Sequence, residues 1–473
     1  MRKRTIFGIF LILTLSLSSA FFAPVLGQES TTDTGTVVAA PAVPSPIERL
    51  FTARLNGASE VPVNASAGTG YGRVVLNAAE NSITASFYWN NLGSGTVAGH
   101  IHGPAAPGVN APILFNMTLT TGLTNGSRED QTFPVTPTDV ANLRAGLFYF
   151  NIHTTNFGGG EIRGQILANR PHDDFDVDAR SDYGIERNVG GSNGQKVFSI
   201  RFNDGTNTER SWGLNGDVSA IGDYDGDGKA DYAVFRQSNG IFYIIKSSDN
   251  TVQTIRFGQS GDKILIADYT ADGKDDVAIT RTSLNSGTPI QFWYFASSGP
   301  FAGRQVEVDW GITGDTPVSG DYNGDGKADF TVERGVSGQA VFFTRLGSDG
   351  AASPGPDRQT AFGLSTDTFV PGDYDGDGKT DIAVTRNQAN QFVWYYIPST
   401  TGGPYQQQAW GTPSTDVQVQ GDYDGDGRTD FAVWRQPASG PAAFYVLGTS
   451  SGSIYVPWGN SLTDAALAVD NTF

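Results

Sequence analysis

Short apolar runs separated by polar turns recur along most of the chain, and they are too short for ordinary helices. In one representative stretch, three runs rich in β-branched and aromatic residues are Tyr232–Arg236, Ile241–Ile245 and Thr251–Phe257. Turns that contain Gly, Ser or Asn separate them, a pattern that is typical of strands. A fourth run, Ile264–Ala267, completes a unit of four strands, which is the content of one propeller blade.

A nine-residue acidic loop accompanies each unit, and the loops recur at a regular period. Their first aspartates fall at positions 174, 223, 268, 321, 373 and 422, so successive periods are 49, 45, 53, 52 and 49 residues. A period of this size indicates a solenoid, an array or a propeller. The first unit begins at its loop and the last ends in the strand Ala465–Asp470, which could complete the first blade and remove both sheet edges. We therefore predict an all-β region of six four-stranded blades over residues 174–473, with an uneven seven-blade ring or an open array as alternatives.

The acidic loops place carboxylates at positions 1, 3, 5 and 9, as in Asp223–Asp231, where they would repel one another unless a hard cation lay between them. Two loops are worn, with Thr270 at the third position of one and Ala179 in place of glycine in another. Calcium accepts six to eight oxygens in irregular geometry, and position 7 can offer its backbone carbonyl; magnesium fits less well, and softer metals prefer His or Cys. Position 12 is apolar and a strand follows, which excludes helix-flanked calcium loops. We predict about six calcium sites, and the predicted ligands, with Lys and Arg acting through their carbonyls, are Asp174, Asp176, Asp178, Asp182, Asp223, Asp225, Asp227, Lys229, Asp231, Asp268, Thr270, Asp272, Lys274, Asp276, Asp321, Asn323, Asp325, Lys327, Asp329, Asp373, Asp375, Asp377, Lys379, Asp381, Asp422, Asp424, Asp426, Arg428 and Asp430.

These loops, each followed by an Ala-Val-like strand, resemble the FG-GAP/VCBS repeats of integrin α-chains and of bacterial surface and secreted proteins. The resemblance covers residues 174 to about 470 and implies that the loops bind calcium and that the faces of the disc bind ligands. A second marker, an aromatic residue followed by glycine, recurs in phase with the loops, and we interpret it as packing between neighbouring units. Its aromatic residues are Trp212, Phe257, Trp310, Phe362, Trp410 and Trp458.

Residues 48–168 have a different pattern, in which short alternating runs such as Ile83–Trp89 and Leu147–His153 predict an antiparallel β-sandwich. Three motifs in this stretch, Leu55–Pro62, Ala98–Ala105 and Asn151–Gln165, occur in an order that resembles the CHRD domain, the module named from chordin. The resemblance implies a fold class, whereas it indicates little about biochemical activity.

Three of the four histidines lie in these motifs. His100 and His102 are two residues apart, so on a strand both point to one face, and His153 ends another run. Such a set could bind copper or zinc through neutral imidazoles. The arrangement resembles a stripped copper/zinc superoxide dismutase, although a fourth copper histidine, a zinc loop and a cysteine pair are missing. The alternative is that these imidazoles satisfy turn carbonyls near Glu161, and His172 is assigned no role.

The N-terminal residues indicate export. Arg2–Arg4, the apolar run Ile6–Leu17 and small residues up to Gly27 predict a secretory signal peptide at 1–27, because the apolar run is shorter than the ~20 residues of a membrane span. Residues 28–47 are rich in Pro, Ser and Thr and predict a linker. We expect the mature chain to be secreted or on the cell surface, with no membrane span.

The composition of the chain limits the classes of partner that it can bind. A formal charge of −18 argues against nucleic acid and anionic membranes, which need basic patches. The absence of cysteine removes disulfides, so bound calcium is a plausible source of rigidity. Outside the calcium loops we find no nucleophile elbow and no recurring catalytic pair. The sequence thus favours a monomeric binding or adhesion protein for an extracellular glycan or protein; the competing hypotheses are a copper-dependent redox enzyme and a propeller hydrolase or lyase.

Overall fold

The computed structural model describes residues 50–77, 79–168, 171–191, 194–270, 272–282, 290–296, 303–318, 320–346, 358–438 and 440–467. The chain divides into two compact units, residues 1–41 and 42–473, and every described residue belongs to the second. The predicted signal peptide and linker fall outside the described residues. Within the described ranges, no helix has both the length and the apolar character needed to cross a membrane.

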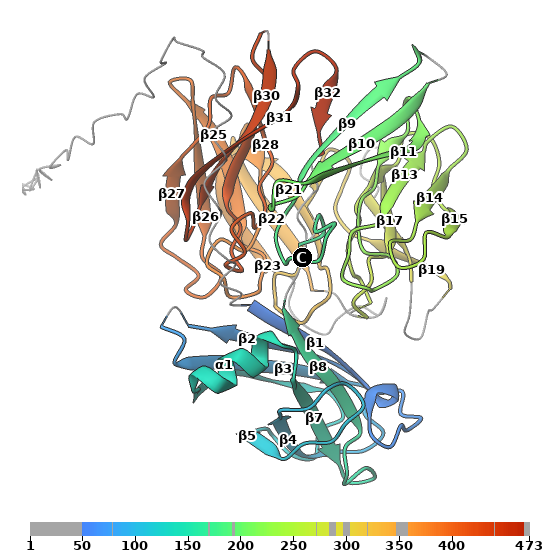
Figure 1. Ribbon diagram of the computed structural model, residues 1–473, viewed down its shortest axis with the longest axis vertical. Coiled ribbons are helices and arrows are strands. Elements are labelled where there is room, and N and C mark those ends of the chain that lie inside the picture. The colour runs from blue at the N-terminus through green and yellow to red at the C-terminus, as the bar shows by residue number, and fades with distance from the viewer. Residues whose placement is uncertain are drawn as a thin grey trace, which may run out of the picture. The chain divides into compact units, whose positions relative to one another are not determined.

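Residues 183–466 form six four-stranded antiparallel sheets that Figure 1 shows arranged around a common centre. In the second and sixth blades, the strand that follows the acidic loop is apolar and buried over most of its length, whereas the outermost strand alternates between exposed and half-buried positions. The strands, blade by blade, are β9 (Tyr183–Val189), β10 (Gln195–Arg201), β11 (Asn207–Leu214) and β32 (Asp464–Ala466); β12 (Val218–Ser219), β13 (Tyr232–Arg236), β14 (Ile241–Ile245) and β15 (Val252–Arg256); β16 (Lys263–Ile264), β17 (Val277–Thr282), β18 (Ile290–Phe295) and β19 (Gln305–Asp309); β20 (Thr316–Pro317), β21 (Phe330–Val336), β22 (Gln339–Arg345) and β23 (Arg358–Leu364); β24 (Thr368–Phe369), β25 (Ile382–Gln388), β26 (Gln391–Ile397) and β27 (Gln406–Ala409); β28 (Asp416–Gln418), β29 (Phe431–Arg435), β30 (Pro441–Gly448) and β31 (Gly452–Asn460).

The first blade is completed from the far end of the chain, because β32 pairs antiparallel with β9 and Asp464 lies opposite Arg187. The prediction of a six-bladed ring closed in this way is confirmed. Closing the ring leaves no blade edge to pair with another chain at this point.

The acidic loops are also joined in a closed circuit. In each loop the main-chain N–H of the eighth residue donates to the main-chain carbonyl of the first residue in the preceding loop, and the last loop connects back to the first. The donor and acceptor pairs, with their N···O distances, are Ala230 to Asp174 (2.8 Å), Asp275 to Asp223 (2.7 Å), Ala328 to Asp268 (2.8 Å), Thr380 to Asp321 (2.7 Å), Thr429 to Asp373 (2.7 Å) and Ser181 to Asp422 (2.7 Å). Six identical contacts therefore fix the loops to one another.

Aromatic side chains link each blade to the next. The indole N–H of Trp212 donates to the carbonyl of Tyr243 at 3.0 Å, and Trp410 reaches Tyr445 in the same manner. Across the closure, Trp458 of the last blade donates to Ser199 of the first at 3.2 Å. The recurring aromatic residue is therefore an interblade contact, as the sequence indicated.

An ion pair recurs in five blades between a buried aspartate and a partly exposed arginine 19 residues later. The Arg334 guanidinium donates two hydrogen bonds of 2.7 Å to Asp315, which also accepts the N–H of Ile312 at 2.8 Å. In the first blade Arg187 and Asp464 pair across the closure at 3.1 Å. The other pairs are Asp217–Arg236, Asp262–Arg281, Asp367–Arg386 and Asp416–Arg435.

The N-terminal domain is one continuous eight-stranded antiparallel sheet that is barrel-like, in the order β5-β4-β7-β8-β1-β2-β3-β6. The antiparallel strands are as predicted, but they are not divided between the two separate sheets of a sandwich. Register shifts between Ala85 and Phe87 and between Ile101 and His102 mark bulges, which let a single sheet curl. One helix, α1 (Pro137–Arg144), begins at a capping box and adds Val140 and Leu143 to the core. The strands are β1 (Leu50–Asn56), β2 (Thr69–Leu76), β3 (Ser82–Asn90), β4 (Thr96–His102), β5 (Ile113–Met117), β6 (Gly126–Pro134), β7 (Phe148–Thr154) and β8 (Ile162–Ala168).

Candidate metal centres

Carboxylates organise the backbone of each acidic loop. In Asp223–Asp231, one oxygen of Asp223 accepts the N–H of Gly226 at 2.6 Å and the other accepts that of Gly228 at 2.8 Å. Asp231 accepts the N–H of Tyr224 at 2.9 Å. Both glycines have φ of +79°, the left-handed region that a Cβ disfavours, so glycine is the residue that forms this turn without strain.

The worn first loop keeps the same shape despite its substitutions. Ala179 takes φ of +64° and Val177 φ of +74°, and Asp174 still accepts the N–H of Ala179 at 2.8 Å. The loop therefore adopts a conformation that is unfavourable for its own residues. The surrounding contacts, including the N–H of Ser181 on the carbonyl of Asp422, hold it in that conformation.

The predicted ligands come together in part. In four loops the first, third and ninth carboxylates each bring one oxygen within 4.8 Å of the others; these groups are Asp174, Asp176, Asp182; Asp223, Asp225, Asp231; Asp373, Asp375, Asp381; and Asp422, Asp424, Asp430. The loops that begin at Asp268 and Asp321 carry Thr270 and Asn323 at the third position, so they have fewer carboxylates to share a cation.

The fifth carboxylate has a different position from the other three. It accepts the N–H of the seventh residue, as Asp227 does from Lys229 at 2.9 Å and Asp426 from Arg428 at 2.9 Å. It is outside the three-carboxylate groups, although the sequence placed it among the ligands.

Burial and mutual repulsion raise the pKa of several of these carboxylates. Burial raises the pKa of Asp223 to about 7 and that of Asp381 to about 8, and neighbouring aspartates add to both shifts. One oxygen of Asp182 and one of Asp424 are buried without a hydrogen-bond partner. A divalent cation among these oxygens would remove the repulsion and supply the missing partner. An all-oxygen donor set of this kind fits calcium.

Hydroxyl residues beside the loops complete the polar shell, and the sequence reasoning missed them. Asp231 accepts the N–H of Ser247 at 2.6 Å, and Asp225 accepts the hydroxyl of Ser248 at 2.5 Å. The equivalent pairs in the last two blades are Ser399 with Thr400 and Thr449 with Ser450. The available signal was a Ser/Thr pair that starts 16 to 19 residues after the ninth aspartate.

Three histidines of the N-terminal domain form a second, nitrogen-based centre. His100 and His102 on β4 and His153 on β7 each bring one ring nitrogen within 4.8 Å of the others. Burial lowers the pKa of all three imidazoles, that of His100 to about 4. The two carboxylate oxygens of Glu161 accept hydrogen bonds from Ser66 at 2.6 Å and from Thr154 at 2.5 Å.

Comparison with known families supports both halves of this architecture. Residues 51–166 match the CHRD domain, and residues 373–433 match an FG-GAP-like repeat. The chain contains a CHRD domain and an FG-GAP-like repeat. The matched repeat runs from the acidic loop at Asp373 into β29, beyond the loop at Asp422, which is a little more than one period of the propeller.

Similarity to other proteins is otherwise weak. The search of solved structures gives the acylaminoacyl peptidase of Pyrococcus horikoshii in its orthorhombic crystal form, at 10% identity and a TM-score of 0.24. The alignment covers 84% of this chain but only 52% of that protein, so the chain spans about half of its length. A similarity at this level carries no argument about fold or activity. Comparison with curated proteins gives no match.

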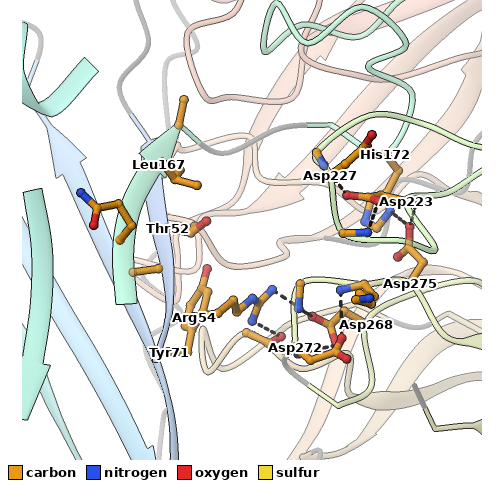
Figure 2. Close-up of a pocket in the computed structure, with 18 of the residues that line it drawn as sticks. Thr52, Arg54, Tyr71, Leu167, His172, Asp223, Asp227, Asp268, Asp272 and Asp275 are labelled. Atoms are coloured by element: carbon orange, nitrogen blue, oxygen red, sulfur yellow. Dashed lines mark hydrogen bonds and ion pairs between the residues drawn. The ribbon is translucent and has the colours of Figure 1, made fainter. Parts of the chain in front are cut away.

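A pocket of about 510 Å³ lies where the CHRD domain meets the propeller loops, and Figure 2 shows Arg54 of β1 pointing into it. The guanidinium of Arg54 pairs with Asp268 at 3.0 Å and donates to the carbonyl of Gly326 at 2.9 Å. Arg54 therefore brings its positive charge to the two loops that have fewer carboxylates.

His172, to which the sequence assigned no role, forms an ion pair in the same pocket. Its Nδ1 lies 2.8 Å from a carboxylate oxygen of Asp275, the eighth residue of a worn loop (Figure 2). Burial lowers the pKa of His172, but Asp275 outweighs this effect and raises the pKa to about 9. The same oxygen of Asp275 accepts the N–H of Asp223 at 2.7 Å, so the pair joins two loops.

Proposed function

We propose that this chain is a secreted or cell-surface binding protein in which calcium holds the FG-GAP propeller rigid. The observation that carries the proposal is the convergence of three carboxylates in each of four loops, within a circuit of hydrogen bonds that joins all six. Such a circuit transmits the rigidity of each occupied loop to the next. A rigid disc of this kind presents preorganised faces, which lowers the cost of binding an extracellular glycan or protein.

The calcium sites fall into two classes. Four loops offer three clustered carboxylates, whereas the loops that begin at Asp268 and Asp321 offer fewer and lie beside Arg54. Ligand charge is a main determinant of calcium affinity. We therefore expect about six ions per chain at saturation, four of them bound more tightly than the other two.

Calcium titration of the chelator-treated full chain by calorimetry tests this proposal. Asp225→Asn and Asp375→Asn should each remove or strongly weaken one tight site, because each removes the third carboxylate of a group. Asp249→Asn is the matched control, since Asp249 is exposed in a turn of the same blade and accepts only from Thr251. A wild-type chain that binds no calcium, or loop variants that bind as the control does, would refute the proposal.

Export is tested separately. When the full chain is expressed with its own leader, the protein recovered outside the cell should begin after one of residues 20 to 27. N-terminal sequencing of the extracellular fraction measures this. Recovery only inside the cell, with Met1 retained, would contradict the secreted or surface location and leave the calcium result unaffected.

A further inference from the structure

The register of two neighbouring strands brings the three histidines to one surface of the CHRD sheet. In the β4–β7 pair, Ala98 lies opposite His153 and His100 lies opposite Asn151. Residues that face each other across an antiparallel pair project to the same side of the sheet, as do residues two apart on one strand. His100, His102 and His153 therefore share one side, although about 50 residues separate the two strands in the sequence.

Hydrogen bonds to carbonyl groups determine the tautomers of two of these imidazoles. Nδ1 of His102 lies 2.9 Å from the carbonyl of Ala111, and Nδ1 of His153 lies 3.0 Å from the carbonyl of Gly158. A carbonyl can only accept, so both Nδ1 atoms carry the proton and both Nε2 atoms hold a free lone pair. A carbonyl that accepts the other ring N–H in this manner is a usual means by which proteins orient a metal-binding histidine.

One of the resulting lone pairs has no partner. Nε2 of His102 is buried without a hydrogen bond, and His102 as a whole is only 9% exposed. Nε2 of His153 lies 3.0 Å from Nδ1 of His100, so these two nitrogens are already close together. A hydrogen bond between His100 and His153 gives each of these two nitrogens a partner. It leaves Nε2 of His102 without one.

The surroundings keep His102 in place. Its ring stacks on Tyr149 with centroids 4.9 Å apart and an angle of 5° between the planes. The guanidinium of Arg163 covers the same tyrosine ring at 3.4 Å. The orientation of His102 is thus set by packing as well as by its hydrogen bond to Ala111, which is the preorganisation that a ligand site needs.

We propose that Nδ1 of His100, Nε2 of His102 and Nε2 of His153 bind one late first-row divalent metal ion. A tetrahedral ion with nitrogens at about 2.0–2.1 Å holds them about 3.4 Å apart. The nitrogens of His100 and His153, now 3.0 Å apart, would therefore separate slightly, whereas the other separations already lie within 4.8 Å. Neutral imidazoles select zinc or copper over calcium and magnesium, and the Irving–Williams order places Cu²⁺ above Zn²⁺. Three protein ligands leave a coordination position open to water or another small molecule.

Titration with the metals alone tests the proposal on the full chain, stripped of transition metals and kept in calcium. We expect one equivalent of Zn²⁺ to bind, and one equivalent of Cu²⁺ to bind more tightly in competition. The spectrum of the copper complex should show nitrogen coupling from imidazoles. Binding of neither ion, or a copper spectrum without that nitrogen coupling, would overturn the proposal whether or not the variants fold.

Variants locate the site. His102→Asn and His153→Asn keep a side-chain N–H that can donate to the carbonyls of Ala111 and Gly158 but remove the Nε2 ligand. Each should weaken Zn²⁺ binding at least tenfold, and the double variant should lose the single equivalent. His172→Asn is the matched control, because it makes the same change at an imidazole outside the cluster, and its Zn²⁺ affinity should equal that of the wild type. Unchanged binding in the folded double variant would place the metal elsewhere and overturn the proposal.

Discussion

The two folded regions of this chain hold their strands together by different means. Among the residues that the structure describes, the CHRD domain has one apolar cluster of 19 buried side chains, whereas the largest such cluster in the propeller blades has 12. The propeller adds repeated polar contacts to these smaller clusters, namely acidic loops, Arg–Asp pairs and interblade tryptophan hydrogen bonds. The comparison teaches that repetition can replace a large core when each unit carries its own polar links. Under the proposed calcium binding, we expect the propeller to depend on cations more than the CHRD domain does.

Removal of calcium is the strongest test of this difference. Each ion at 100 times its dissociation constant stabilises the state that binds it by about 2.7 kcal/mol, so four tight sites contribute on the order of 10 kcal/mol. We expect chelation to lower the melting temperature of the propeller by on the order of 10 °C or more and to leave the CHRD domain nearly unchanged. Calorimetry combined with hydrogen exchange measures the two regions separately. Equal melting with calcium and with chelator would contradict this dependence.

Loss of one Arg–Asp pair should have the next largest effect. Asp315→Asn removes the charge opposite Arg334 and should lower the free energy of unfolding by about 3 kcal/mol, because the arginine is left without its buried counter-ion. Denaturant unfolding in saturating calcium measures the change. Asp204→Asn is the control, since Asp204 is an exposed turn residue that accepts from Thr206. A loss no larger than that of the control would show that the pairs do not stabilise the blades.

The CHRD domain should show a pH dependence of its own. Burial raises the pKa of Glu60 to about 7. Below the unfolded pKa of 4.5, both the folded and the unfolded state hold the proton of Glu60. As the pH rises from 4.5 to 7, the unfolded state loses this proton first, so the free energy of unfolding falls by about 3 kcal/mol in total. Above pH 7 this contribution is constant.

Glu60→Gln removes this titration, and its advantage over the wild type should grow between pH 5 and pH 8. Chemical unfolding at fixed saturating calcium measures the difference and keeps the loop carboxylates ionised. A difference between the two proteins that does not change with pH would show that Glu60 is ionised in the folded domain.

The smallest expected effect concerns the two classes of loop. Asn323→Asp supplies the missing carboxylate at the third position of the loop that begins at Asp321, and it should tighten calcium binding there about tenfold, which is about 1.4 kcal/mol. Asn323→Gln, which adds no charge, is the control. Calorimetric titration compares them. Equal affinities would show that the number of carboxylates does not set the two classes.

The propeller could be predicted from the sequence because its information is local. A nine-residue acidic motif, with glycine at fixed positions in most of its copies, determines the loops, and a period near 50 residues determines the blades. The strand at the end of the chain revealed the closure, since β32 completes the blade of β9.

Features that depend on distant contacts were missed. The partners of the recurring aspartates, such as Arg334 for Asp315, lie on another strand. The curling of the CHRD strands into one sheet depends on bulges that no residue pattern marked.

The closure of the ring has a mechanical consequence. Among the described residues, strand pairing across this junction is made by β32, three residues long, which pairs with β9. The pair Arg187–Asp464 and the hydrogen bond from Trp458 to Ser199 cross the same junction. A stretching force applied at the C-terminal end acts first on this short strand, so we expect the propeller to open there, between its first and last blades, before any other blade unravels.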